Sequence, residues 1–311
     1  MKQFLVLSKE NIELSSWEVK EYLNIDNYEL VDNFMIFTKE YEERSVNLAY
    51  TKKILKLLFR CDVKEIKSKL ESFDFDNFYE KDFSLRIPQD NSLEVEYSSY
   101  IWETLEVPKV NLKNPHTKFE IYFSDKEAFV CLLIKELDNN FESRKSHKRP
   151  SPHPSSLHPK LARAMVNMLG DVKVVVDPFC GSGGTLIEAA LAGNYVVGID
   201  LDPIMIKRCY NNLKHFGIEK FELEQADSTT VQKMDYFVAD LPYGLNTKSQ
   251  ELNGLYDKFF SDLQFKKAVV GFPDFIDYKK ILKKHDIKIK KEFDYYLHKS
   301  LNKKILILSL R

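Results

Sequence analysis

The sequence lacks the features of a membrane or secreted protein. No apolar run approaches the roughly 20 residues that cross a bilayer, and the N-terminal MKQFLVLSKENIELSS is too short and too soon acidic for a signal peptide. The four cysteines, Cys61, Cys131, Cys180 and Cys209, are scattered, with neither a CxxC pair nor a histidine cluster at metal-binding spacing. We therefore expect a cytoplasmic protein that has no membrane partner and no bound metal.

An excess of positive charge is also missing. The formal net charge is -1, from 46 Lys and Arg against 47 Asp and Glu. Residues 1–140 hold 19 basic against 27 acidic residues, whereas residues 141–160 hold 5 against 1. This distribution argues mildly against a protein that binds nucleic acid by charge alone. A nucleic-acid partner would meet local basic patches in the middle and the C-terminal half.

The length and the first half of the chain predict more than one domain. A chain of 311 residues is longer than one core usually supports, so we expect two or three domains. Helix and strand patterns alternate over residues 1–140, which predicts an α+β region in two small lobes. Helices are expected at residues 11–23, 46–60 and 98–105, and strands at residues 2–8, 28–39, 82–87, 110–114, 118–124 and 127–137. The helix at 46–60 is expected because its apolar residues recur on one helical stripe.

The second half of the chain has a different pattern of residues. Residues 141–158 are basic and rich in proline, which removes backbone donors and disfavours helix, so they predict a linker. A helix is expected at 159–170, and buried strands then alternate with helices to residue 311, which predicts a doubly wound, mostly parallel sheet. The last two strands, at 287–300 and 303–311, are expected to form an antiparallel hairpin joined at residues 301–303.

The strongest motif is VVVDPFCGSGGTLIEAALAG, at residues 174–193. A buried strand ends at Asp177, a turn with three glycines follows, and a helix begins. Dinucleotide-binding enzymes use such a turn too, but the GxGxxG spacing is missing here. The carboxylate of Asp177 would repel a pyrophosphate and suits a ligand with a positive amino group, such as the methionine part of S-adenosylmethionine.

Two more acids follow the next strands. GIDLDP places Asp200 to accept the ribose hydroxyls of a nucleoside, and QADST places Asp227 to accept an adenine amino group. Each of these acids alone could simply cap the end of its strand. Three acids at the ends of successive strands favour the interpretation that they line one crevice for a cofactor. The predicted cofactor-binding residues are Asp177, Phe179, Gly181, Ser182, Gly183, Asp200, Leu201, Asp227 and Ser228.

The fourth strand ends in DYFVADLPYG, which places Asp240, Leu241, Pro242 and Tyr243 beside the same crevice. An exocyclic amine such as guanine N2 is a weak nucleophile because its lone pair is delocalised into the ring. The Asp240 carboxylate and the Leu241 carbonyl could each accept one N–H, and Tyr243 could stack on a flipped base. Asp240 could also take up the proton. Alone this segment could be an ordinary turn, but after the cofactor motif it predicts the catalytic residues.

These motifs resemble those of amino-methyltransferases. With RPSPHPSSLHPKLARAMVNM before the first strand, the chain is most similar to the archaeal THUMP-domain tRNA (guanosine-N2) methyltransferases that act on guanosine 10. The resemblance implies S-adenosylmethionine as cofactor and tRNA as partner. It also implies an N-terminal ferredoxin-like lobe (1–50), a THUMP-type RNA-binding domain (51–140), the linker (141–158) and a Rossmann-like methyltransferase domain (159–311). The family usually has Asp-Pro-Pro-Tyr, and here the second position is Leu241.

Two basic sets are candidates for RNA contact. We predict contact from the linker residues Arg144, Lys145, Lys148 and Arg149. Lys52, Lys53, Lys56 and Arg60, on the expected helix at 46–60, fit RNA contact and a solvated helix face equally well.

The sequence is compatible with more than one function. The alternatives are a related THUMP methyltransferase acting on another tRNA guanosine near the acceptor stem, an amino-methyltransferase of rRNA or DNA, and a tRNA-binding protein with a degenerate methyltransferase fold. We expect a monomer. The target nucleotide, the number of methyl groups added and a need for a small activator subunit are left open.

Overall fold

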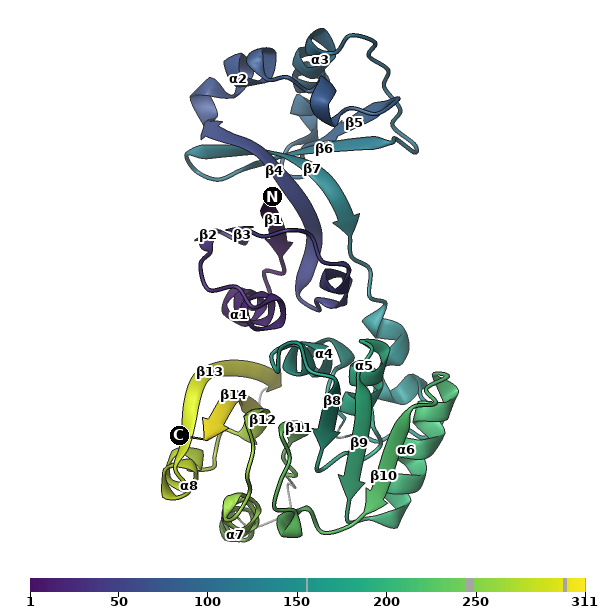
Figure 1. Cartoon of the computed structure of the whole chain (residues 1–311), viewed down its shortest axis with the longest axis vertical. Helices are drawn as coiled ribbons and strands as arrows, with labels where there is room; N and C mark the ends of the chain where they lie inside the picture. The colour runs from purple at the N-terminus through teal and green to yellow at the C-terminus, as the bar shows by residue number, and fades with distance from the viewer. Residues whose placement is uncertain (155, 244–248, 299–300, 311) are drawn as a thin grey trace. The chain divides into compact units, whose positions relative to one another are not determined.

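The chain forms two compact units in a computed structural model, which describes all residues except 155, 244–248, 299–300 and 311 (Figure 1). Unit 1 comprises residues 1–12, 25–46 and 51–138, and unit 2 comprises residues 13–24, 47–50 and 139–311. The expected boundary after residue 50 does not separate the units, because one helix and one short segment from the first 50 residues group with the C-terminal half.

Unit 1 is built on one seven-stranded sheet of order β2-β3-β1-β4-β7-β6-β5. Neighbouring strands are antiparallel except for β5 and β6, which are parallel. The strands are β1 (Lys2–Leu7), β2 (Glu29–Val31), β3 (Phe34–Thr38), β4 (Thr51–Asp62), β5 (Phe83–Arg86), β6 (Thr117–Phe123) and β7 (Glu127–Glu136), and the helices are α2 (Ile66–Ser72) and α3 (Glu94–Thr104). Because β4 pairs with both β1 and β7, the sheet runs without a break across the expected lobe boundary.

The predicted helix at residues 46–60 is wrong. Most of that segment is the long strand β4, whose edges are satisfied on both sides by β1 and β7. Sheet pairing with distant strands outweighs the local helical spacing of its leucines. The predicted strand at 110–114 is also absent apart from an isolated bridge between Val110 and Phe83. The helix predicted at 11–23 is confirmed as α1 (Ile12–Leu23).

Unit 2 contains a second seven-stranded sheet, of order β10-β9-β8-β11-β12-β14-β13. Its first five strands are parallel, and β14 and β13 are antiparallel to their neighbours, which confirms the doubly wound sheet with a closing hairpin. The strands are β8 (Val174–Asp177), β9 (Tyr195–Asp200), β10 (Phe221–Gln225), β11 (Tyr236–Asp240), β12 (Lys267–Pro273), β13 (Ile287–His298) and β14 (Leu301–Leu310). Residues 301–303 already belong to β14, so the two strands are not joined there as expected.

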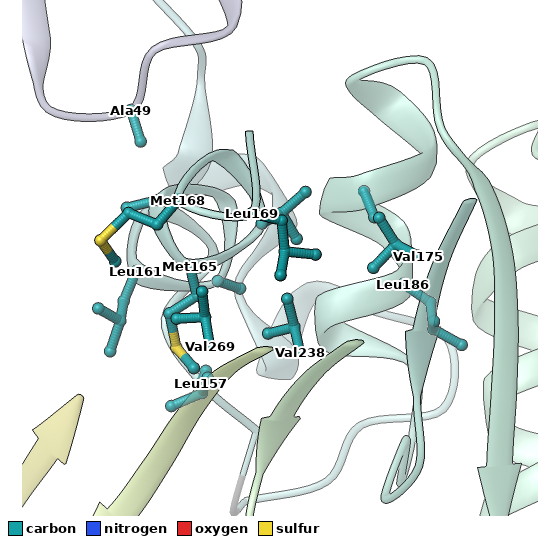
Figure 2. Packing of buried hydrophobic residues seen from close by; sticks show 14 of the residues in the cluster. Ala49, Leu157, Leu161, Met165, Met168, Leu169, Val175, Leu186, Val238 and Val269 are labelled. Carbon is teal, nitrogen blue, oxygen red and sulfur yellow. The ribbon is translucent and has the colours of Figure 1, made fainter. Parts of the chain in front are cut away.

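The helices of unit 2 are α1, α4 (Pro159–Asn167), α5 (Gly184–Leu191), α6 (Pro203–His215), α7 (Ser249–Phe260) and α8 (Tyr278–Lys284). Figure 2 shows α4 packing its apolar face against the sheet, with Leu161 and Met165 beside Val238 and Val269. Ala49 and Leu14 belong to the same core, which explains why α1 and residues 47–50 group with this unit. Unit 2 therefore includes a helix from the N-terminal end of the chain.

A buried carboxylate fixes this N-terminal helix. Glu18 on α1 accepts hydrogen bonds from the backbone N–H groups of Ala49 and Tyr50, at 2.6 and 2.9 Å, and from the Asn167 amide on α4, at 2.6 Å. Burial raises the pKa of the Glu18 carboxyl, and these donors oppose that rise. The donors therefore offset part of the cost of burying the charged carboxylate.

The strand order sets the position of a crevice. From β8 the chain moves outward through β9 and β10, and it returns to place β11 on the other side of β8. In such sheets a crevice opens at the carboxyl ends of the strands where this direction reverses. Asp177 ends β8 and Asp240 ends β11, so both lie at this edge. Among the described residues, no helix is long and apolar enough to cross a membrane.

Candidate active site

A cavity of about 580 Å³ lies at this edge of the unit 2 sheet. It brings together all but one of the predicted cofactor and catalytic residues, and Gly183 is the exception. The residues predicted from the sequence that line it are Asp177, Phe179, Gly181, Ser182, Asp200, Leu201, Asp227, Ser228, Asp240, Leu241, Pro242 and Tyr243. The motifs of four successive strand ends thus surround one space.

The charge of the cavity wall is negative. Five aspartates line the cavity, namely Asp177, Asp200, Asp202, Asp227 and Asp240, and no Lys or Arg stands among the described lining residues. Such a wall opposes phosphate and favours a ligand that carries positive charge. The residues present therefore fit a sulfonium nucleoside with an amino group better than a dinucleotide.

Asp177 is a buried residue that lines the cavity. Its carboxylate accepts the Phe179 backbone N–H at 3.1 Å. Burial raises the pKa of Asp177 to about 7, and the charges of Asp240 and Asp200 add to the rise. A cationic group placed beside this buried carboxyl would favour its ionised form.

The glycine turn has two functions. Gly181 donates its N–H to Asp200 Oδ2 at 2.8 Å, which joins the turn to the end of β9. Gly183 adopts a φ of +86°, and a Cβ there would lie 2.7 Å from the Cys209 sulfur on α6. Gly183 is therefore needed for the turn and for the close approach of α6 rather than for lining the cavity.

Asp200 and Asp227 each hold the loop that follows them. Asp200 Oδ1 accepts the Asp202 N–H at 3.0 Å, and Asp227 Oδ1 accepts the Thr229 N–H at 3.0 Å. Hydrogen bonds from Thr229, joined by Lys258, lower the pKa of Asp227. Each of these aspartates can cap its loop and still bind a ligand, because a carboxylate accepts more than one hydrogen bond.

The backbone after β11 is fixed although position 241 is Leu and not the Pro of the Asp-Pro-Pro-Tyr motif. Leu241 donates its N–H to Gly271 O at 3.1 Å, a bond that a proline could not form. Its side chain is fully buried in the core formed by β11, β12 and α7. Tyr256 on α7 donates its hydroxyl to the Pro242 carbonyl at 2.7 Å. Three contacts thus hold the loop that presents Asp240 and Tyr243.

Asp240 has a partner that sequence reasoning missed. Lys303 on β14 forms an ion pair with Asp240 Oδ1, and its ammonium lies 4.0 Å from the centroid of the Tyr243 ring. The Lys303 side chain is 0% exposed and that of Asp240 is 15% exposed. Burial raises the pKa of the Asp240 carboxyl, and Lys303 opposes the rise. A lysine within a strand pattern carries no motif that would reveal this contact.

The linker also lines the cavity, which was not predicted. His153, Ser156 and Leu157 face the cavity, and the hydroxyls of Ser156 and Ser182 lie 3.1 Å apart. Further lining residues missed from the sequence are Thr185, Met205, Leu252 and Leu255. Serine and histidine in a proline-rich segment resemble any exposed linker, so the sequence gives no signal for this placement.

The two linker arginines, both predicted to contact RNA, are turned inward and bind groups within the protein. Arg144 binds the fully buried Glu188 on α5 through two hydrogen bonds, at 2.6 and 3.0 Å. Arg149 is 4% exposed, donates to the Arg144 carbonyl at 2.9 Å, and lies against Gly184. Lys148 is exposed, and Lys145 forms an ion pair with Glu142 at 2.7 Å. These two lysines stay candidates for RNA contact.

The second basic set does not form one face of a helix. Lys53 on β4 is bound to the buried Glu120 at 2.7 Å, and Arg60 is bound to Glu29 at 2.7 Å. Lys56 lies over the Phe78 ring. Because the segment is a strand, and because Lys53 and Arg60 are paired with acids, these four residues do not form the single helix face considered from the sequence.

Comparisons with known proteins agree with this geometry. A family model described as an RMKL-like methyltransferase domain matches residues 146–303, and a model described as a DNA methylase matches residues 10–211. The chain is 30% identical to the tRNA (guanine(10)-N2)-dimethyltransferase of Methanothermobacter thermautotrophicus, over 99% of each chain. It is also 30% identical to the protein of that name from Pyrococcus abyssi, over 65% of each chain. The crystal structure of TrmN from Thermus thermophilus aligns over the whole of both chains, with a TM-score of 0.56 and 16% identity, which shows a shared fold.

The sheet order, the acid-lined cavity and the motif after β11 define an S-adenosylmethionine-dependent methyltransferase of Rossmann-like fold. The full-length similarity then specifies the kind. The chain belongs to the tRNA (guanine(10)-N2)-dimethyltransferase family.

Proposed function

We propose that this enzyme methylates the exocyclic N2 of guanosine 10 in tRNA. The observation that carries the proposal is the position of Asp240, Leu241 and Tyr243 at one end of an acid-lined cavity. The substrate of the named relatives supports the choice of tRNA and of position 10.

The cofactor would be held by the strand-end acids. Asp177 would bind its amino group, Asp200 its ribose hydroxyls and Asp227 its adenine amino group, with Leu201 against the ring. Leu201 is largely exposed at the cavity rim, which suits an apolar surface that a base can cover. When bound, S-adenosylmethionine supplies an electrophilic methyl group whose bonding electrons leave with the sulfur.

The protein's own groups would prepare the guanine nitrogen. Asp240 and the Leu241 carbonyl would accept its two N–H groups and direct its lone pair towards the methyl carbon. Tyr243 would stack on the flipped base, a contact worth about 1–3 kcal/mol. The N2 proton would pass to Asp240 as the new N–C bond forms.

We propose dimethylation as the outcome, because the related enzymes carry that activity in their names. After the first transfer one N–H remains on N2, so the second transfer needs one acceptor instead of two. Asp240, once the first proton has been released to solvent, would then accept that N–H and its proton, while the first methyl group faces the Leu241 carbonyl. The two steps therefore use the same residues.

We propose that strands β4 to β7 and helices α2 and α3 of unit 1 form the THUMP-type RNA-binding domain. A hollow in this unit is lined by Arg86, Lys113 and Lys118 together with acidic residues. Arg86 is paired with Glu94 at 2.9 Å. Lys113 and Lys118 are exposed and form no ion pair with any residue that the structure describes, so they remain available for phosphate. With Lys145 and Lys148 they are the proposed tRNA contacts.

Incubation of the purified chain with an unmodified tRNA transcript and labelled cofactor tests the proposal. We expect N2,N2-dimethylguanosine in digests of the wild-type transcript and none when guanosine 10 is replaced by adenosine. Methylation that persists in the replaced transcript would favour a related enzyme acting on another guanosine. Because the chain is used alone and as the proposed monomer, the assay also shows whether an activator subunit is required.

A further inference from the structure

The Lys303 side chain combines three properties that a structural lysine seldom shows. It is fully buried, its ammonium contacts the carboxylate at the proposed catalytic position, and it also lies over the aromatic ring next to that position. It does not line the cavity, whereas Asp240 and Tyr243 do. Lys303 can therefore act on a substrate only through these two residues.

The sheet explains how a lysine distant in sequence reaches the site. Lys303 pairs in register with Pro273 on β12 and with Tyr295 on β13, so it occupies the central strand of three. Asp240 is the last residue of β11 and pairs with Gly271 on β12. A Cβ on Gly271 would lie 3.1 Å from Asp240 Oδ1, so the absence of a side chain at 271 keeps room for the carboxylate.

Stability alone is a poor explanation for this ion pair. A buried ion pair loses the hydration of both charges, and its replacement by apolar groups is often neutral or stabilising. The pair here is placed at the carboxyl edge of the sheet, where the cavity opens. Its position suits a role in the reaction better than a role in folding.

We propose that Lys303 is a positioning residue that orients and keeps ionised the Asp240 carboxylate and holds the Tyr243 ring for base stacking. The proposal rests on the proposed function. With Oδ1 held by the ammonium, Oδ2 is the oxygen directed to the N2–H of guanine. One face of the Tyr243 ring is covered by the ammonium, and the base stacks on the opposite face.

The charge state of Asp240 depends on what surrounds it. Among the described residues, Lys303 faces it from β14 and Asp177 acts from β8. Tyr243 follows it three residues later in the chain, and Tyr256 acts from α7. Lys303 is the one cation in this group. Without it, burial and the Asp177 charge would favour the protonated form of Asp240, which cannot accept an N–H on the protonated oxygen.

Lys303→Met, Lys303→Arg and Lys304→Met test the proposal. Lys304 is the adjacent residue on β14 and pairs with Asp294 instead, which makes it a matched control. Single-turnover transfer to tRNA is measured from pH 6 to pH 9, with KM for tRNA and affinity for S-adenosylhomocysteine. We expect Lys303→Met to lower the single-turnover rate about 100-fold at pH 7, with KM for tRNA and affinity for S-adenosylhomocysteine within about threefold of wild type. The acidic limb of its pH–rate profile should lie at higher pH. Lys303→Arg should recover about tenfold or more of the loss, and Lys304→Met should stay within about twofold of wild type.

The contrary result is an unchanged rate and pH profile for Lys303→Met, or a loss that Lys303→Arg does not recover. A titration of ¹³C-labelled aspartate by NMR on the free protein adds a readout that needs no substrate. The pKa of Asp240 should rise in Lys303→Met, and an unchanged value would overturn the proposal. If wild type transfers no methyl group to tRNA, the proposed function fails, and this titration still decides the role of Lys303. If Lys303→Met does not fold, Lys303→Gln is measured in its place.

Discussion

At the scale of single residues, position 241 shows how one contact is replaced by another. The related motif has a rigid proline there, and this chain has a leucine whose N–H is bonded to Gly271 O and whose side chain is buried in the core. The sequence showed the departure, but it could not show the compensation, because the partner lies 30 residues away on β12. The carbonyl of Leu241 is therefore held by packing and hydrogen bonding instead of by a ring.

Leu241→Pro should lower stability although it restores the usual motif. The substitution removes the N–H donor and leaves Gly271 O without its partner, at a cost of about 1–3 kcal/mol. Thermal unfolding measures the effect. Leu241→Met keeps the donor and most of the volume and should stay within about 1.5 kcal/mol of wild type. A melting temperature for Leu241→Pro at or above that of wild type contradicts the account.

Asp177→Asn should raise the stability of the protein at high pH and weaken its binding of the cofactor. The pKa of Asp177 in the folded protein is about 7, above the ordinary value of 3.8 for an aspartate, so the folded state binds more protons than the unfolded state between these values. The contribution of Asp177 to stability thus falls as pH rises through this window and is least favourable above pH 7. At pH 8 the variant should unfold on the order of 2–4 °C higher than wild type, with a smaller difference at pH 5.

The same variant should bind S-adenosylhomocysteine at least about tenfold more weakly at pH 8, because the charge that binds the amino group is gone. Calorimetry measures this loss. Wild-type affinity should also fall as pH drops below 7, since Asp177 becomes protonated. Equal affinity of the two proteins at pH 8 would remove Asp177 from the cofactor site.

At the scale of elements, sequence patterns were reliable where packing is local. The glycine turn, the strands of unit 2 and α1 were predicted, because buried apolar runs and turn residues specify them. The strand β4 was missed because its conformation depends on β1 and β7, which flank it in the sheet. The linker was predicted as an element, but its docking was not, since the ion pair of Arg144 is with Glu188, 44 residues further along the chain.

Arg149 and Lys148 should behave differently although they are neighbours. Arg149→Ala removes a buried side chain that packs on the first turn of α5, so it should lower the melting temperature by several degrees, or about 1–3 kcal/mol. Lys148→Ala should leave stability unchanged and weaken tRNA binding. The slope of log affinity against log salt concentration should become shallower by about one, because one phosphate contact is lost. Unfolding and binding titrations from 50 to 200 mM salt distinguish these effects. The reverse pattern would return Arg149 to the RNA-binding surface.

At the scale of the whole molecule, sequence order and structural units do not coincide. Helix α1 and residues 47–50 belong with the methyltransferase half, and Glu18 joins them to α4. A domain boundary read from composition cannot reveal this, because the partners are up to 149 residues apart.

Glu18→Ala should therefore destabilise the methyltransferase unit. It leaves the N–H groups of Ala49 and Tyr50 and the Asn167 amide without their acceptor, at a cost of about 3 kcal/mol or more. Thermal unfolding with and without S-adenosylhomocysteine follows this unit. Glu13→Ala, on the same helix but with an exposed side chain, is the control and should cost less than about 1 kcal/mol. Equal melting temperatures for Glu18→Ala and wild type would place α1 outside the unit.

We propose that Asp240, which lines the acid-lined cavity, prepares the nucleophile for methyl transfer. The most direct test is the single-turnover rate of methyl transfer to tRNA by Asp240→Asn, with S-adenosylhomocysteine affinity measured on the same preparation. We expect a rate at least about 100-fold below wild type, with the affinity retained within about threefold. A rate within threefold of wild type would contradict it.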